Sequence, residues 1–272
     1  MDYKIIAIDA DGTLLDSNHQ ISNENKSALM EAQQLGIHMV MCSGRSPHTL
    51  VKMMDEIKIE NAQNYIIGFN GGIVLDAQTM ETLSETRLAK RHVIDIAAQL
   101  GHFNVGIMAY EQQDKLVVEK WTSYSKEYSE LAQLPLNIYS FEKLPPSVNK
   151  LLLGGETKEL IRAKNYYTDK VPEGVNMFFT GVHLLEFTGT GATKGAALKF
   201  LCQKLNIPAG ASVAIGDSYN DISMIQAAGL GVVMANANDD VKALGKYVTK
   251  NDNNNSGVAE AVRKLVIKEM RA

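Results

Sequence analysis

The sequence predicts an α/β protein with a Rossmann-like parallel-sheet core, into which a second, α+β domain is inserted. At both ends of the chain, short apolar runs alternate with helical patterns, which is typical of βαβ units and a parallel sheet. The middle contains further strand-like and helical patterns, but none of its strands ends in a carboxylate of the kind found outside it. We therefore expect the core in residues 1–83 and 185–272 and the inserted cap domain in residues 84–184.

The N-terminal part shows the alternation clearly. An apolar run over 5–8 is followed by a helix that Ser22 would cap and Gly36 would close. A strand over 37–42 comes next, and Pro47 is placed to start the following helix. These elements predict the first βαβ unit of the core.

The alternation continues with a strand over 65–69, which ends in the turn signal Asn-Gly-Gly. The same alternation of strand and helix patterns returns in the C-terminal third. The expected elements of that third are a helix over 194–205, a strand over 212–215, a helix over 219–227, strands over 231–234 and 247–249, and a helix over 257–269. In the inserted domain we expect helices over 88–100 and 156–167 and strands over 103–109, 115–119, 150–153, 175–179 and 182–187.

Composition excludes several classes of protein. The 272 residues are 45% hydrophobic and 21% charged, as in an ordinary globular protein. The net charge of −4 provides no basic field for nucleic acid or an anionic membrane surface, so neither partner is expected. No apolar run approaches the roughly 20 residues that span a bilayer. No signal peptide is recognisable, and Cys42 and Cys202 lie in apolar patterns, so we expect buried, reduced thiols and a cytoplasmic location.

Two carboxylates, Asp9 and Asp11, directly follow the first apolar run, and Gly12 then allows a sharp turn. If strand geometry persisted, both side chains would point the same way, because strand side chains repeat with period two. One carboxylate could act as a nucleophile while its neighbour exchanges a proton. Taken alone, the motif equally describes a polar turn.

A second acidic pair, Asp217 and Asp221, follows the apolar run over 212–215. Helix capping would explain one of these acids but not both, together with another acidic strand end elsewhere. In an open parallel sheet, ligands bind outside the carboxyl ends of the strands, so both acidic loops would share one edge with Asp9. Such a site suits Mg²⁺ and a substrate phosphate.

Ser43 and Lys194 are the candidate phosphate contacts. Ser43 follows the strand over 37–42, where its hydroxyl and a backbone N–H could hold a phosphate oxygen or form an ordinary turn. Lys194 follows a glycine-rich loop, but it precedes Gly195, so the order is not that of a Walker A loop. A lysine at a helix N-terminus is electrostatically unfavourable, which suggests that it faces an anion; a solvated lysine is the alternative.

Four motifs, read in order along the chain, resemble those of the haloacid dehalogenase (HAD) superfamily. They are Asp-x-Asp-Gly-Thr-Leu-Leu, Ser-Gly-Arg, Lys-Gly and Gly-Asp-x-x-Asn-Asp. More narrowly, the chain resembles Cof-type phosphatases, which carry a large type IIB α/β cap between the second and third motifs, and within them the sugar-phosphate phosphatases. The resemblance covers nearly the whole chain, including Asn70-Gly71, Leu185-Glu186 and the run Met234-Ala235-Asn236-Ala237.

The resemblance implies a Mg²⁺-dependent phosphatase that hydrolyses a small phosphorylated metabolite, most simply a sugar phosphate, through an aspartyl-phosphate. Asp9 would be the nucleophile, and Asp11 would protonate the leaving group and then activate water. The cap would exclude water and select the leaving group. The remaining implied roles are phosphate binding by Asp9, Ser43, Gly44, Lys194 and Asn220, and metal binding by Asp9, the backbone carbonyl of Asp11 and Asp217. Asp221 would support the metal through water or orient its neighbours.

Other functions stay open at this point. Pyridoxal phosphate or flavin mononucleotide are alternative substrates. A receiver-like phospho-acceptor would be shorter, lack a cap and have no Asp two residues after the acceptor. A phosphomutase on this scaffold usually has a smaller cap between the first two motifs, and the segment between Asp11 and Ser43 is too short for one. The polar loop over 251–257 has Ser256 where the family often has Asp, and we assign it no role.

Overall fold

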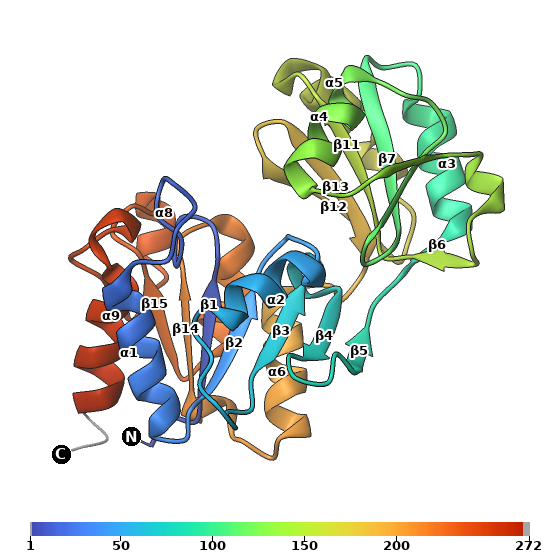
Figure 1. The fold of residues 1–272 in the computed structure, drawn as a ribbon. Coiled ribbons are helices and arrows are strands. Elements are labelled where there is room, and N and C mark those ends of the chain that lie inside the picture. The colour runs from blue at the N-terminus through green and yellow to red at the C-terminus, as the bar shows by residue number, and fades with distance from the viewer. Residues whose placement is uncertain (1, 269–272) are drawn as a thin grey trace. The chain divides into compact units, whose positions relative to one another are not determined.

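The structure, a computed structural model, describes residues 2–268 and divides into two compact units (Figure 1). One unit consists of the chain up to Ser84 together with the chain from Thr193 onward, and the other of Glu85–Ala192. The inserted unit ends at Ala192 rather than at residue 184, because the strand Leu184–Gly189 pairs with two strands of that unit.

The outer unit contains an eight-stranded sheet in the order β16-β15-β14-β1-β2-β3-β4-β5. Its strands are β1 (Ile5–Asp9), β2 (His38–Cys42), β3 (Tyr65–Gly68), β4 (Ile73–Asp76), β5 (Thr82–Glu85), β14 (Ser212–Gly216), β15 (Leu230–Val233) and β16 (Tyr247–Val248). The pairs from β16 through β3 are parallel, and β4 is antiparallel to β3. Every residue of β1 and β14 is buried, as expected for central parallel strands. The predicted α/β class and parallel core are confirmed.

The strand register aligns the carboxyl ends at which the predicted site residues lie. Asp9 at the end of β1 is opposite Cys42 at the end of β2, and Ile8 is opposite Ile215 of β14. Ser43 and Asp217 directly follow β2 and β14. Because β1 lies between β14 and β2, the loops after these three strands are neighbours.

Helices cover this sheet. They are α1 (Asn23–Gln34), α2 (Pro47–Asp55), α6 (Lys194–Lys204), α7 (Ile222–Ala227), α8 (Asp239–Lys242) and α9 (Gly257–Ala261), which continues as a π-helical segment over Val262–Ile267. Ser22 caps α1, since its side chain accepts a hydrogen bond from the backbone N–H of Asn25. Helices α1 and α9 lie side by side (Figure 1), joined by a hydrogen bond from the backbone N–H of Ala259 to Asn25 Oδ1. Residue 269, the expected end of the last helix, lies outside the described residues.

The inserted unit is an α+β domain with a six-stranded sheet in the order β12-β13-β11-β7-β8-β9 and a separate β10-β6 pair. Its strands are β6 (Leu88–Ala89), β7 (Val105–Gln112), β8 (Lys115–Val118), β9 (Leu136–Ile138), β10 (Ser147–Val148), β11 (Lys150–Gly155), β12 (Val175–Gly181) and β13 (Leu184–Gly189). Its helices are α3 (Lys90–Leu100), α4 (Ser123–Ala132) and α5 (Thr157–Tyr167). All the strands and helices expected in this unit are present, and α4, β9 and the short strands β6 and β10 are additional.

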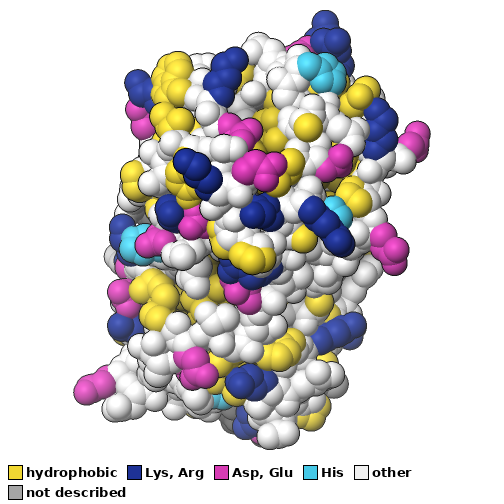
Figure 2. Space-filling model, turned by 90° about the vertical axis from the view of Figure 1, so that its right-hand side faces the viewer, with side chains coloured by type: hydrophobic (Ala, Val, Ile, Leu, Met, Phe, Trp, Pro, Cys, Tyr) yellow, Lys and Arg dark blue, Asp and Glu magenta, His cyan; other side chains and the backbone are white. Residues whose placement is uncertain are grey.

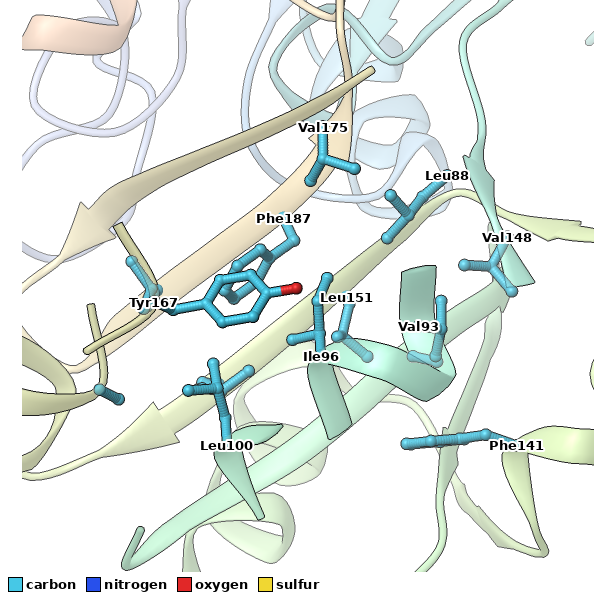
Figure 3. Close-up of a cluster of buried hydrophobic side chains, with 14 of the residues drawn as sticks. Leu88, Val93, Ile96, Leu100, Phe141, Val148, Leu151, Tyr167, Val175 and Phe187 are labelled. Carbon is cyan, nitrogen blue, oxygen red and sulfur yellow. The ribbon is translucent and has the colours of Figure 1, made fainter. Parts of the chain in front are cut away.

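A hydrophobic core of its own stabilises the inserted unit (Figure 3). Side chains from α3, β11 and β13 surround Tyr167 of α5, whose ring meets that of Phe187 edge-on at 5.9 Å. The Tyr167 hydroxyl donates to Asp95 Oδ2 at 2.7 Å, so burial of the ring leaves its polar end paired. Each large apolar side chain buried in such a core contributes about 1.5–3 kcal/mol.

The surface and the cysteines agree with an ordinary globular protein. On the face shown in Figure 2, Lys and Arg side chains are interspersed with Asp and Glu. Cys42 and Cys202 are both free thiols and both buried, as the sequence predicts. Across residues 2–268, no helix is long and apolar enough to cross a membrane.

Candidate active site

A buried lysine joins two of the predicted acidic residues. Lys194 Nζ donates to Asp9 Oδ1 and to Asp221 Oδ1, each at 2.5 Å. Lys194 and Asp221 are completely buried, and Asp9 is nearly so. The structure therefore brings together residues from β1, from the start of α6 and from the loop after β14. Lys194 therefore faces anions, as one of the two alternatives predicted, and is not a solvated lysine.

The local fold fixes Lys194 in this position. Thr193 caps α6, with its side chain accepting from the backbone N–H of Ala196, and Lys194 is the first residue of the helix. A cation is unfavourable at a helix N-terminus, but two adjacent carboxylates more than offset that effect. Burial lowers the pKa of Lys194, yet attraction to Asp221 and Asp9 outweighs burial and holds the pKa above its ordinary value. Lys194 is therefore charged at neutral pH.

Asp221 organises the loop that carries Asp217. Its Oδ2 accepts from the backbone N–H groups of Asp217 and Ser218, both at 3.0 Å, while its Oδ1 accepts from Lys194. Gly216 packs so closely that a Cβ there would lie 2.5 Å from Asp221 Cβ. Both oxygens of Asp221 are thus occupied by groups of the protein, which suits an orienting role.

Asp217 faces the loop after β1. Its Oδ1 accepts from Thr13 Oγ1 at 2.8 Å, and its Oδ2 lies 2.6 Å from where a Cβ on Gly12 would be. Gly12 has a φ of +79°, so both its conformation and its contact with Asp217 require glycine. Burial raises the pKa of Asp217 to about 6, against the hydrogen bond from Thr13, which lowers it.

The donor set fits a hard divalent cation. Asp9, Asp217 and Asp221 each offer a carboxylate oxygen, and these oxygens all lie within 4.8 Å of one another. Carboxylate oxygens are the ligands that Mg²⁺ prefers. Burial, followed by repulsion from Asp221, raises the pKa of Asp9 well above its ordinary value, and the three clustered carboxylates exceed the single charge of Lys194. A bound cation would relieve that excess.

Asp11 lies apart from these carboxylates. Its side chain is 48% exposed and is held by Arg45, which donates from Nε to Oδ2 at 2.8 Å and from Nη2 to Oδ1 at 2.6 Å. If strand geometry persisted beyond Asp9, the side chains of Asp9 and Asp11 would point the same way. Instead the chain turns after Asp9, and the bidentate ion pair holds the carboxylate of Asp11 on Arg45.

The other predicted phosphate-binding residues, Ser43, Gly44 and Asn220, lie in the loops after β2 and β14. Ser43 is buried, and its Oγ accepts from the backbone N–H of Arg45 at 3.2 Å, as in an ordinary turn. The backbone of Gly44 packs against the amide of Asn70, and Asn220 Nδ2 donates to Asn70 Oδ1 at 2.9 Å. Gly44 and Asn220 therefore contact the same side chain.

Sequence reasoning gave no role to three residues that the structure places at the site, namely Thr13, Arg45 and Asn70. All three stand inside motifs that were recognised, but their contacts cross between loops. The hydrogen bond from Thr13 to Asp217 spans more than 200 positions of the chain, and that between Asn70 and Asn220 spans 150. Position within a motif was the only sequence signal for them.

The loop over 251–257, for which the sequence predicts no role, contacts the loop after β1. Asn253 Nδ2 donates to the carbonyl of Leu15 at 2.9 Å, and the backbone N–H of Ser17 donates to Asn254 Oδ1 at 2.9 Å. Asn236 Nδ2 also donates to the carbonyl of Gly12 at 2.8 Å. These asparagines hold the segment that follows Asp11.

Comparison with known proteins places this arrangement in a family. A model of the haloacid dehalogenase-like hydrolases matches residues 6–262. Phosphatase YwpJ of Bacillus subtilis is 32% identical, over 97% of this chain and 100% of that protein. A second B. subtilis protein, 5-amino-6-(5-phospho-D-ribitylamino)uracil phosphatase YcsE, is 32% identical over 98% of this chain and 97% of its own length.

A solved structure gives the same result for the fold. The crystal structure of a haloacid dehalogenase-like hydrolase from Bacteroides thetaiotaomicron superposes with a TM-score of 0.86 at 29% identity. The match covers 97% of this chain and 99% of that one, so it includes the inserted unit as well as the core.

Proposed function

Because this chain belongs to the haloacid dehalogenase-like hydrolases and is a phosphatase, we propose that it hydrolyses small phosphomonoesters through an aspartyl-phosphate on Asp9, with Mg²⁺ bound at the acidic site. The observation that carries the proposal is the buried contact of Asp9 with Lys194, beside Asp217 and Asp221. A nucleophilic carboxylate is favoured where a fixed cation orients it and stabilises the charge of the arriving phosphoryl group.

The proposed reaction has two steps. In the first, a carboxylate oxygen of Asp9 attacks phosphorus, the bond from phosphorus to the ester oxygen breaks, and Asp11 gives a proton to the departing alkoxide. In the second, Asp11 takes a proton from water, the water oxygen attacks phosphorus, and the bond between phosphorus and Asp9 breaks to release phosphate. One group serves as acid and then as base, as microscopic reversibility allows.

Asp11 has to leave Arg45 for these proton transfers. Its side chain is half exposed, so turning it needs no rearrangement of the core. Between turnovers the bidentate pair would keep the side chain of Asp11 in a fixed starting position beside the site.

The charges at the site support the metal assignment. Lys194 balances one of the three clustered carboxylates, and a divalent cation would balance the other two. We propose that Asp9 and Asp217, together with the backbone carbonyl of Asp11, hold Mg²⁺, while Asp221 orients Lys194 and the loop of Asp217. When bound, Mg²⁺ would offset the repulsion between the anionic nucleophile and the phosphate.

For the substrate, we propose a phosphorylated sugar or sugar alcohol. The relative YcsE is named for a substrate that carries its phosphate on a ribityl chain, and it aligns along nearly the whole of this protein. Phosphorylated cofactors such as pyridoxal phosphate or flavin mononucleotide are the second candidate class.

The test is phosphate release from p-nitrophenyl phosphate with and without Mg²⁺, comparing the wild type with Asp9→Asn. Asp169→Asn, at an exposed aspartate of the inserted unit, is the matched control. We expect Mg²⁺-dependent turnover in the wild type and the control and none in Asp9→Asn. Turnover that survives Asp9→Asn would overturn the mechanism. A panel of sugar, sugar-alcohol and cofactor phosphates then separates the two substrate classes by kcat/KM.

A further inference from the structure

A strained turn follows β3 at the same edge of the sheet as the site. Phe69, Asn70 and Gly71 have φ values of +51°, +57° and +99° in succession, and all three are buried. Left-handed backbone is costly for residues other than glycine and persists only where the surroundings over-determine it. Strain of this kind concentrates at functional sites, so the surroundings of the turn are informative.

The middle residue of the turn contacts two loops of the site. Asn70 Oδ1 accepts from Asn220 Nδ2 at 2.9 Å, in the loop that also carries Asp217. The backbone N–H of Asn70 donates to the carbonyl of Ser43 at 2.9 Å. A Cβ on Gly44 would lie only 2.9 Å from Asn70 Nδ2, so that side-chain amide packs directly on the backbone of Gly44.

The last residue of the turn contacts the loop that presents Lys194. A Cβ on Gly71 would lie 2.2 Å from the carbonyl oxygen of Thr193 and 2.9 Å from the backbone nitrogen of Lys194. The turn Phe69–Gly71 thus touches the segments that carry Ser43, Lys194 and Asn220. The turn therefore packs against all three segments, and these contacts can hold its left-handed backbone in place.

From these contacts we propose that Asn70 is a positioning residue for the phosphoryl group and acts through the side-chain amide of Asn220. The inference rests on the proposed function. An amide nitrogen carries two hydrogens, and Asn70 Oδ1 accepts one of them. This fixes the plane of the Asn220 amide, so that its second hydrogen has a defined direction in which to donate to a phosphoryl oxygen.

The residue type at this position follows from two requirements. The residue at this position has a φ of +57°, so it has to adopt left-handed backbone, which favours Gly, Asn and Asp. The contact with Asn220 Nδ2 requires an acceptor, which removes Gly. Aspartate would add another buried negative charge where a phosphate dianion has to bind. Asparagine alone satisfies all three conditions.

The test replaces the side chain without disturbing the backbone. Asn70→Gly keeps the left-handed conformation and removes the acceptor, and Asn61→Gly is the matched control, since Asn61 has φ +63° and is exposed. We expect kcat/KM for p-nitrophenyl phosphate to fall about 10- to 100-fold in Asn70→Gly, the usual cost of losing a group that orients a contact residue. Asn61→Gly is expected to match the wild type.

A double-mutant cycle separates positioning from a general structural role. In an Asn220→Ala background, Asn70→Gly should cost less than about 3-fold, because the group through which it acts is gone. An equal loss in both backgrounds, or no loss in the wild-type background, would overturn the inference.

A second readout does not depend on turnover. Thermal stabilisation by orthovanadate with Mg²⁺ should be weaker in Asn70→Gly than in the wild type and in Asn61→Gly. If Asp9→Asn abolishes activity while Asn70→Gly matches the wild type in both assays, only the role of Asn70 fails. If the wild type shows no Mg²⁺-dependent phosphatase activity, the proposed function fails, and vanadate binding still decides whether Asn70 shapes an anion site.

Discussion

The two units each bury a lysine, and the charges around these lysines distinguish the proposed active site from a simple ion pair. Lys194 in the core is 0% exposed and contacts Asp9 and Asp221, with Asp217 beside them. Lys150 of β11, in the inserted unit, is 1% exposed and contacts one carboxylate, Glu186 of β13, at 2.8 Å. Around Lys194 three carboxylates cluster beside one ammonium group, whereas Lys150 forms an ion pair with Glu186.

The surroundings of Lys150 complete its neutralisation within the inserted unit. Its ammonium lies 5.3 Å from the centre of the Tyr110 ring, and Glu186 Oε1 accepts a second hydrogen bond from Thr180 Oγ1 at 3.0 Å. In this pair the charge of Lys150 is offset by that of Glu186. The carboxylates around Lys194 leave a net negative charge that a bound cation can balance. Four experiments test this proposed difference between the two lysines.

Removing the lysine of the core should have the largest effect. Lys194→Met leaves the carboxylates of Asp9 and Asp221 buried without a cation, so we expect a loss of about 3–5 kcal/mol in the free energy of unfolding. In the molecules that remain folded, kcat should fall about 10²- to 10³-fold, since a donor to the phosphoryl group is lost. Urea denaturation without metal and steady-state kinetics measure the two effects. A stable, active variant would contradict the role given to Lys194.

Removing the lysine of the inserted unit should change stability but not chemistry. Lys150→Met strands the charge of Glu186 and should cost about 3–5 kcal/mol in the free energy of unfolding of that unit. Adding Glu186→Leu should recover most of that loss, because a balanced pair can be replaced by apolar side chains at little cost. Denaturation of both variants tests this, and kcat per folded molecule is expected to stay within about 3-fold of the wild type. A double variant no more stable than Lys150→Met would break the comparison.

Adding Mg²⁺ should stabilise the core and leave the Lys150 pair unaffected. At 100 times its dissociation constant, a bound ion contributes about 2.7 kcal/mol to the folded state. We expect this stabilisation in thermal unfolding of the wild type and its loss in Asp217→Asn. Lys150→Met should still show the stabilisation, which makes it the control. A shift that persists in Asp217→Asn would place the ion elsewhere.

The smallest expected effect concerns Arg45. In Arg45→Lys the charge remains, but the two-point contact with Asp11 is lost. We expect kcat/KM to fall about 10-fold, equivalent to about 1.4 kcal/mol, with little change in thermal stability because the pair is partly exposed. Arg162→Lys, at an exposed pair with Glu159, is the matched control. Equal activity in both variants would remove Arg45 from the mechanism.

The positions of Asp9, Ser43 and Asp217 could be predicted because buried parallel strands have continuous apolar sequences. Where such a run stops, the chain has reached the edge of the sheet, and hydrophobicity alone locates that point. Lys194 was ambiguous for the opposite reason. The local argument from the helix N-terminus goes against a lysine there, and only two acids distant in sequence reverse it.

The remaining features were beyond sequence reasoning because they depend on long-range contacts. Helix α4 has a single buried residue, Ser125, so no apolar stripe marked it. The capping box of Thr122 and Ser125 stabilises its start, but that motif is weak when no apolar run follows. The support that Asn70 gives to the site depends on a left-handed turn and on Asn220, which is 150 positions away.

The pairing of β1 with β14, in which Ile5 lies opposite Ser212, also sets the order of events during synthesis. β1 emerges from the ribosome before β14 and waits for it until the whole inserted unit has been made. At about 5–20 residues per second, that wait is roughly 10 to 40 s. During it the inserted unit can fold on its own core, while one edge of β1 stays open to wrong partners. Until β14 pairs with it, that edge of β1 is therefore a place where aggregation can start.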